Sequence, residues 1–88
     1  DNGTFIEDLD EELIWINVFP NPFKDKLNIQ SPMPISQIEL FSISGKCILK
    51  ENGNGNFLKL NAAQLNPGIY FLKIHTNQGQ VIRKLVIE

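Results

Sequence analysis

The chain has 88 residues, of which 42% are hydrophobic and 20% are charged, and its formal net charge is −2. A composition of this kind predicts one folded domain and argues against disorder along the whole chain. No apolar run approaches the roughly 20 residues that a membrane-spanning helix needs, so we expect no membrane insertion. The acidic start lacks the basic residues of a signal peptide, which favours either a cytosolic protein or a fragment of a longer precursor.

The charges are unevenly distributed along the chain. Residues 1–12 contain six acidic residues and no basic residue, whereas residues 13–88 contain eight basic and four acidic residues, a net charge of +4. A nucleic-acid interface needs clustered Lys and Arg with interleaved aromatic residues. The basic residues here are few and scattered, so we expect no nucleic-acid partner.

Residues 1–13, DNGTFIEDLDEEL, differ in character from the rest of the chain. Thr4 and Glu7 have the spacing of a capping box, and the apolar residues of the segment could share one helical face. A helix of this length is marginal in water unless it docks on a partner. We therefore interpret residues 1–13 as a solvated acidic linker, with a short helix as the alternative, and residues 14–88 as the folded domain.

From residue 14 onward the apolar residues alternate with a period of two, which is typical of β-strands. The sequence predicts seven short strands, at residues 14–19, 26–30, 37–43, 46–51, 56–60, 69–76 and 80–87. Turn residues separate them: PNP (20–22), SPMP (31–34), Ser44-Gly45, the hairpin sequence NGNG (52–55), NPG (66–68) and NQG (77–79). The prolines are thus expected to lie between strands and not within them.

These short strands predict an all-β fold, because the connections leave no room for the helices that parallel crossovers need. About seven antiparallel strands suggest two sheets packed face to face, as in immunoglobulin-like β-sandwiches. Trp15 does not fit the alternation of Ile14 and Ile16. It either covers the end of the sandwich or docks on the leader, and the sequence does not decide between these positions.

Residues that could carry chemistry are few. His75 is the only histidine and Cys47 the only cysteine, which is too small a set for a zinc site. We expect Cys47 to be a small core residue, because free cysteines are usually buried and inert. Nothing in the sequence indicates a nucleophile with an adjacent base, so we expect neither an enzyme nor a cofactor.

Two further patterns resemble ligand sites but lack features that those sites need. The acidic cluster of Asp8, Asp10, Glu11 and Glu12 lacks the central glycine and the spacing of a calcium-binding loop, and we interpret it as a solvating segment. The GNG sequence (53–55) lacks the lysine and the strand–helix context of a phosphate-binding loop. No metal site is therefore expected.

Four motifs in order resemble one known family. The segments are VFPNPFKDKLNI (18–29), IELFSISGKCI (38–48), LNPGIYFLKI (65–74) and KLVIE (84–88). Together they resemble the C-terminal sorting domain of the type IX secretion system, which Bacteroidetes-type bacteria use. The resemblance covers residues 16–88.

The resemblance implies a specific role. Such domains resemble immunoglobulin-type sandwiches at the end of larger secreted proteins, and residues 1–13 would then link the domain to a preceding cargo region. The outer-membrane export machinery is expected to read the domain in the periplasm, and a sortase-like peptidase to remove it. The cargo would then be released or anchored at the cell surface, and the domain would be an address label and not a catalyst.

The family's motif positions transfer residue by residue, except at the last residue, where Glu88 stands in place of a frequent basic residue. The sorting-motif residues are Pro20, Asn21, Pro22, Gly45, Lys46, Pro67, Gly68 and Tyr70, and the candidate recognition strand is Lys84, Leu85, Val86 and Ile87. Each match also has an architectural interpretation. Tyr70 has the position of a tyrosine corner, whose hydroxyl bonds back to nearby backbone. In the last strand, Val81, Leu85 and Ile87 can face the core, with Ile82 and Val86 on the opposite face.

An alternative function is an accessory adhesive or carbohydrate-binding module of a secreted protein. It depends on Trp15, Phe41 and Phe71 facing outward and forming one stacking platform. The opposing interpretation packs these rings between sheets or against the leader. The sequence leaves the oligomeric state open, since an edge strand could pair with another copy.

Overall fold

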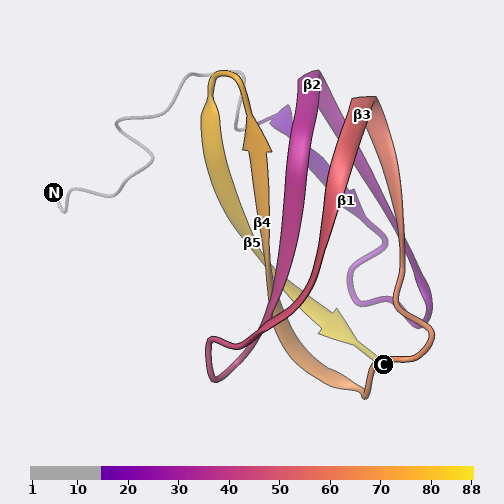
Figure 1. Cartoon of the computed structure of the whole chain (residues 1–88). Helices are drawn as coiled ribbons and strands as arrows, with labels where there is room; N and C mark the ends of the chain where they lie inside the picture. Colours follow the sequence, from indigo (N-terminus) through magenta and orange to yellow (C-terminus); the bar gives the residue numbers. More distant parts are fainter. Residues whose placement is uncertain (1–14) are drawn as a thin grey trace, which may run out of the picture.

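The computed structural model describes residues 15–88, and within them the chain is all-β, as predicted. The described chain forms five strands (Figure 1): β1 (Asn17–Phe19), β2 (Lys26–Ser42), β3 (Cys47–Asn61), β4 (Gly68–Thr76) and β5 (Gly79–Ile87). All pairs of neighbouring strands are antiparallel. The proposed linker, residues 1–13, lies outside the described residues. In the described part of the chain, no helix has the length and apolar character to cross a membrane.

The number of strands is lower than predicted because two of them are long. β2 runs through the predicted strands at 26–30 and 37–43, and β3 runs through those at 46–51 and 56–60. The prediction that SPMP (31–34) and NGNG (52–55) are turns is therefore wrong. Both segments lie inside strands.

The SPMP segment of β2 stays extended because every second side chain continues to face the core. Ser31, Met33 and Ile35 are buried, whereas Pro32 and Pro34 are exposed. Gln30 is opposite Phe57 and Ile35 is opposite Gly55, so residues 31–34 of β2 face a single residue of β3. Prolines are tolerated in such a bulge because the ladder does not need their missing N–H groups.

The bulge is fastened by polar contacts at Ser31. The Ser31 hydroxyl accepts a hydrogen bond from the Met33 backbone N–H at 3.1 Å. The Asn56 side-chain amide donates to the Ser31 carbonyl at 3.0 Å. These contacts satisfy backbone groups that the bulge removes from the ladder.

The NGNG segment of β3 passes close to β2 at the same bend. A Cβ atom built on Gly53 would lie 2.1 Å from the Ile35 carbonyl oxygen, a distance that real atoms do not reach. Glycine is needed here because the two backbones approach too closely for any side chain. The predicted hairpin glycine is in fact the residue that lets two long strands bend together.

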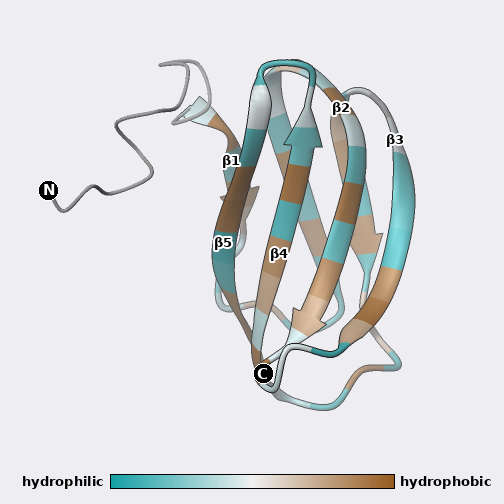
Figure 2. Cartoon of the chain, turned by 60° about the vertical axis from the view of Figure 1, so that its left-hand side comes forward, coloured by the Kyte–Doolittle hydropathy of each residue, from teal (hydrophilic) through white to brown (hydrophobic). Residues whose placement is uncertain are grey.

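The bend divides the sheet into two facing layers, which Figure 2 shows one in front of the other. The three-stranded layer consists of β1, residues 26–30 of β2 and residues 57–61 of β3. The four-stranded layer consists of residues 47–55 of β3, residues 35–42 of β2, β4 and β5. The sheet thus curls over itself as a half-barrel, which is consistent with the predicted immunoglobulin-like sandwich.

The core lies between the two layers. Its fully buried aliphatic side chains are Leu27, Ile29 and Leu60 from the three-stranded layer and Ile35, Ile38, Leu40, Leu72, Ile74 and Leu85 from the four-stranded layer. Opposite residues pair directly, as with Leu27 and Leu60 or Leu40 and Leu72. Each such side chain contributes about 1.5–3 kcal/mol when it leaves water.

Cys47 and Trp15, whose positions were considered from the sequence, both lie at the surface. Cys47 is exposed at the start of β3, so the prediction of a core cysteine is wrong. The register between β2 and β3 shifts between Leu40 and Phe41, at the position where Cys47 pairs with Phe41. The outward position of Cys47 coincides with this shift. Trp15 is 71% exposed and lines a surface groove together with Gln30 and Phe57 of the three-stranded layer. The alternative that it docks on the leader falls on residues 1–13, outside the described residues.

Candidate functional site

The predicted sorting-motif residues and the candidate recognition strand lie at one end of the sandwich, although they are far apart in sequence. Gly68 is opposite Ile87, and Tyr70 is opposite both Leu85 and Ser42. Residues 45–46 follow Ser42 directly in the turn between β2 and β3, and residues 20–22 bond to β5. We call this region the motif end, defined by residues 20–22, 45–46, 67–70 and 84–87. In Figure 1 it is the lower end of the molecule, where β5 ends and β4 begins.

A side-chain contact within the motif end joins Asn21 to β5. The Asn21 Nδ2 atom donates to the Lys84 carbonyl at 3.0 Å, and the Val86 backbone N–H donates to Asn21 Oδ1 at 3.1 Å. One side-chain amide thus makes the two hydrogen bonds that a neighbouring strand would make. We call this pair of bonds the Asn21 clamp.

Phe23 extends the clamp by one step along the same edge. Its backbone N–H donates to the Val86 carbonyl at 3.0 Å, and the Glu88 N–H donates to the Phe23 carbonyl at 2.7 Å. Phe23 and Ile87 form a parallel bridge, and both side chains are buried in the core. The outer edge of β5 from residue 84 to residue 88 is therefore closed by the chain before β2.

The PNP sequence suits this role because of what proline removes. Pro20 and Pro22 have no N–H group, so their backbone cannot donate to β5. A proline also holds the residue before it in an extended conformation, which applies to Phe19 and Asn21. The Asn21 side-chain amide supplies both a donor and an acceptor to β5.

Replacing Asn21 by alanine is expected to lower the free energy of unfolding by about 1–2 kcal/mol, because two hydrogen bonds are lost at a partly accessible edge. The Val86 amide should exchange with solvent faster than in the unchanged protein, as measured by hydrogen-exchange NMR. Asn21→Asp is the matched variant, because it keeps the acceptor for Val86 and loses the donor to Lys84. Unchanged Val86 exchange in Asn21→Ala would contradict the clamp.

The last strand alternates between the core and the surface as predicted. Val81, Leu85 and Ile87 are buried, and Ile82 lies exposed on the opposite face. Lys84 is exposed and Val86 is half-buried on that same outer face. In the folded domain, the candidate recognition strand therefore presents only Lys84 and Val86 to a partner.

The Gly45-Lys46 motif forms the tight turn between β2 and β3. Gly45 has φ +93°, which favours glycine, and its N–H donates to the Ser42 carbonyl at 2.9 Å. The Ser42 N–H donates to the Lys46 carbonyl at 2.8 Å. These bonds fix the turn and leave the Lys46 side chain exposed at the motif end.

Tyr70 makes the hydrogen bond that a tyrosine corner predicts. Its hydroxyl donates to the Asn66 carbonyl at 2.7 Å, and its ring is buried in the core cluster. The bond ties the Asn66-Pro67-Gly68 turn to the start of β4. This contact confirms an architectural part for Tyr70.

The outer face of the four-stranded layer carries a shallow apolar groove. Phe41 and Phe71 are opposite each other on β2 and β4, and both are half-buried. With Ile43, Ile82 and the stem of Lys73 they line a groove of about 410 Å³. Trp15 is not part of it, so the structure does not bring Trp15, Phe41 and Phe71 into the single platform that the alternative function needs.

A small charged cluster lies on the same layer. His75 Nε2 and Glu39 Oε1 are 2.7 Å apart, and Lys50 Nζ is 3.6 Å from Glu39 Oε2. The hydrogen bond from His75 holds the pKa of Glu39 below its ordinary value of 4.5, and the charges of Lys50 and Lys73 act in the same direction. In residues 15–88, no three His, Cys, Asp or Glu side chains are grouped as a metal site would require.

The lowered pKa of Glu39 predicts a dependence of stability on pH. A carboxyl group whose pKa is lower in the folded state stabilises the fold above its unfolded pKa and loses this effect as the pH falls through the folded value. The free energy of unfolding should thus fall between about pH 5 and pH 3, and part of the fall should vanish in Glu39→Gln. Urea unfolding at each pH measures this, and identical pH profiles for the two proteins would contradict it.

Comparison with known families identifies the chain. A model of the family described as "Secretion system C-terminal sorting domain" matches residues 17–88. The chain belongs to this family. The sorting domain is the C-terminal signal of the type IX secretion system, which carries a larger precursor to the outside of the cell or to its surface. No curated protein matches the chain significantly.

Sequence reasoning placed the motifs of the sorting domain but missed the contact between the first and the last of them. The Asn21 clamp joins residues more than 60 positions apart. One signal was available, because Pro20 and Pro22 remove the N–H groups on both sides of Asn21 and leave its side-chain amide with fewer local partners. Nothing in a single sequence says which edge the amide meets.

Proposed function

We propose that the outer-membrane machinery of the type IX system reads this sorting domain as a folded unit, at the side chains of the motif end. The Asn21 clamp carries this proposal. Together with the backbone bonds of Phe23, it occupies the backbone edge of residues 84–88, so a partner cannot add a strand there without displacing these bonds. The surface that remains for recognition is made of side chains, chiefly Lys84, Val86 and Lys46.

We further propose that the domain passes through the periplasm as part of its precursor and has no catalytic activity of its own. The sorting-motif residues Pro20, Asn21, Pro22, Gly45, Pro67, Gly68 and Tyr70 would then act by building the motif end. This division is supported by the contacts of four of them. Asn21 bonds to β5, Gly45 closes the turn between β2 and β3, and Gly68 and Tyr70 pair with Ile87 and Leu85 of β5.

A sortase-like peptidase is the proposed second partner, and we place its cut within residues 1–13. A peptidase needs an extended and accessible chain. Residues 26–42, 47–61, 68–76 and 79–87 are held in the sheet, which makes them poor substrates. Mass spectrometry of the exported cargo and of the released domain gives the position of the cut, and a cut inside residues 27–88 would contradict this placement.

The proposal is tested by export of a reporter. Residues 1–88 are fused to a periplasmic reporter protein in a cell with an active type IX system, and reporter outside the cell is measured. The fusion should be exported. Lys84→Glu combined with Lys46→Glu should reduce export by about tenfold, equivalent to about 1.4 kcal/mol of binding, while circular dichroism shows an unchanged fold.

Lys59→Glu is the matched control, because Lys59 is an exposed lysine on the outer face of the other layer. It should leave export unchanged. Deleting Lys84–Glu88 should abolish export, but it also removes Leu85 and Ile87 from the core, so this deletion alone does not separate recognition from folding. A folded fusion that stays in the periplasm would refute the sorting function, and full export of the double variant would refute the proposed surface.

A further inference from the structure

The exposed aromatic side chains of the described chain gather on one face. Among residues 15–88, the exposed aromatic residues are Trp15 (71% exposed), Phe57 (45%) and Phe19 (39%). All three belong to the three-stranded layer or to its approach, on the side away from the core. The remaining aromatic residues, Phe23, Phe41, Tyr70 and Phe71, are buried or half-buried.

The register of the strands places polar amides between these rings. Asn17, Gln30 and Phe57 are direct partners across β1, β2 and β3, so they form one row on the outer face. Phe19, Asn28 and Lys59 form the next row. Since adjacent strands lie about 4.8 Å apart, each row spans about 10 Å.

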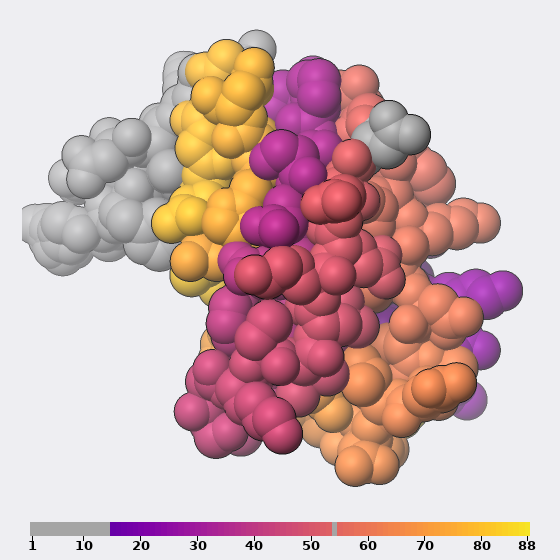
Figure 3. Space-filling model, in the orientation of Figure 1, coloured from indigo at the N-terminus to yellow at the C-terminus, as the bar shows by residue number. Residues whose placement is uncertain are grey.

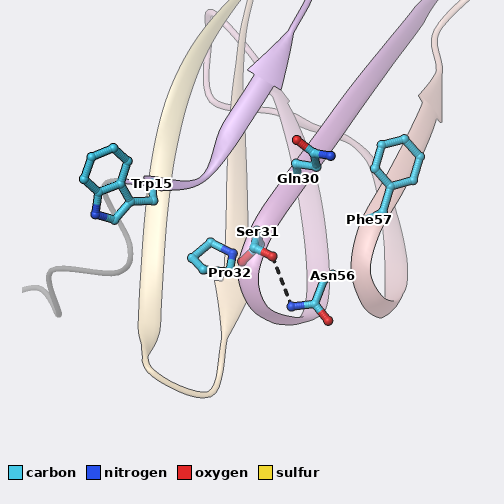
Figure 4. A pocket seen from close by; sticks show the side chains of 6 residues that line it. All are labelled: Trp15, Gln30, Ser31, Pro32, Asn56 and Phe57. Atoms are coloured by element: carbon cyan, nitrogen blue, oxygen red, sulfur yellow. Dashed lines mark hydrogen bonds between the residues drawn. The ribbon is translucent and has the colours of Figure 1, made fainter.

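A groove crosses this face between Trp15 and Phe57. Figure 4 shows the two rings at opposite ends, with Gln30, Ser31, Pro32 and Asn56 between them. The groove has a volume of about 340 Å³, and no charged residue lines it. The Asn56 Nδ2 atom is held by the Ser31 carbonyl at 3.0 Å, which turns the Asn56 amide into a fixed group at the floor.

We propose that this groove binds a neutral oligosaccharide. Aromatic rings offer flat apolar faces on which the C–H faces of a sugar ring can stack. The side-chain amides of Gln30 and Asn56 in the groove, and that of Asn17 next to Gln30 on β1, both donate and accept hydrogen bonds, as sugar hydroxyls do. The site lies on the opposite layer from the groove of Phe41 and Phe71 and does not depend on the proposed reading of the motif end.

The composition of the groove favours a sugar over other ligands that stack on aromatic rings. A single-stranded nucleic acid needs lysine or arginine along its phosphates, and the groove offers none. A proline-rich peptide docks in a groove lined by aromatic rings, whereas here Trp15 and Phe57 lie at opposite ends and the amides of Gln30 and Asn56 lie between them. A neutral ligand with many hydroxyl groups matches both the absence of charge and the amides.

The test uses the whole 88-residue chain and a panel of neutral hexasaccharides with glucose, mannose, xylose or N-acetylglucosamine units. Binding is followed by the fluorescence of Trp15, the only tryptophan, and by backbone NMR shifts. We expect at least one sugar to bind saturably below about 10 mM, with shifts at Gln30, Asn56 and Phe57. Binding should persist in high salt, since no ion pair is involved.

Two variants and one control decide the site. Trp15→Ala and Phe57→Ala should each weaken binding by about tenfold, and Trp15→Phe should restore much of it. Ile43→Ala is the control, because Ile43 is also 71% exposed but lies on the four-stranded layer, and it should bind like the unchanged protein. The proposal is overturned if no sugar binds, if shifts map to the other layer, or if only a polyproline peptide or an oligothymidine binds.

Discussion

Replacing Gly53 by alanine is expected to lower the free energy of unfolding by about 3 kcal/mol. The added methyl group would meet the Ile35 carbonyl oxygen at 2.1 Å and the carbonyl carbon at 2.6 Å. Because these are backbone atoms of β2, the contact can be relieved only by parting the two long strands at their bend. A shift of more than about 10 °C in the melting temperature should accompany the change.

Gly45→Ala separates this steric effect from the ordinary cost of replacing glycine. Gly45 has φ +93°, and a Cβ atom there meets nothing within 4 Å. Its replacement should cost about 1 kcal/mol, from backbone strain alone. The combined variant Gly53→Ala with Ile35→Ala should not recover stability, since the nearest atom belongs to the main chain. Equal melting temperatures for the two glycine variants would refute this account.

The second large effect is expected at Leu85. This side chain is fully buried opposite Tyr70, and truncation to alanine should cost about 3 kcal/mol through lost burial and a cavity. Val86→Ala in the next position should cost less than about 1 kcal/mol, because Val86 lies half-buried on the outer face. Urea unfolding followed by circular dichroism measures both values.

The Leu85→Ala variant also tests whether the export machinery recognises a folded domain or an extended peptide. If the machinery reads a folded domain, Leu85→Ala should reduce export when it populates the unfolded state, and lowering the temperature should restore export. If the machinery instead reads residues 84–87 as an extended peptide, the loss should be independent of temperature. The second result would contradict recognition of the folded motif end.

Local patterns in the sequence were sufficient for the strands and for their inner faces. Apolar residues at every second position, such as Leu27 and Ile29 in β2 or Leu85 and Ile87 in β5, predict the buried side chains. The reason is that successive residues of a strand face opposite sides of the sheet. Val81 of β5 follows the same pattern. The same alternation continues through Ser31, Met33 and Ile35. The sequence prediction nevertheless placed a turn at SPMP, because prolines are expected to end a strand. In the structure a bulge in β2 accommodates the prolines.

The features that were not predicted depend on contacts between distant segments. Nothing local in NGNG distinguishes a hairpin turn from a close approach of two strands. Glycine is required at position 53 because of the carbonyl group of Ile35, which is 18 residues earlier in β2. Cys47 was expected inside from residue type alone. The face of Trp15, Gln30 and Phe57 arises only when β1, β2 and β3 align, since these residues belong to three separate segments.

The Asn21 clamp determines when, during translation, the motif end can form. Synthesis proceeds from the amino end, so Asn21 and Phe23 leave the ribosome more than 60 residues before the backbone groups that they bond. A chain that stops before residue 84 lacks both these partners and the buried Leu85 and Ile87. The motif end therefore forms only on a chain that has been translated through residue 87. If the export machinery reads the motif end as we propose, a product interrupted before residue 84 would not be exported.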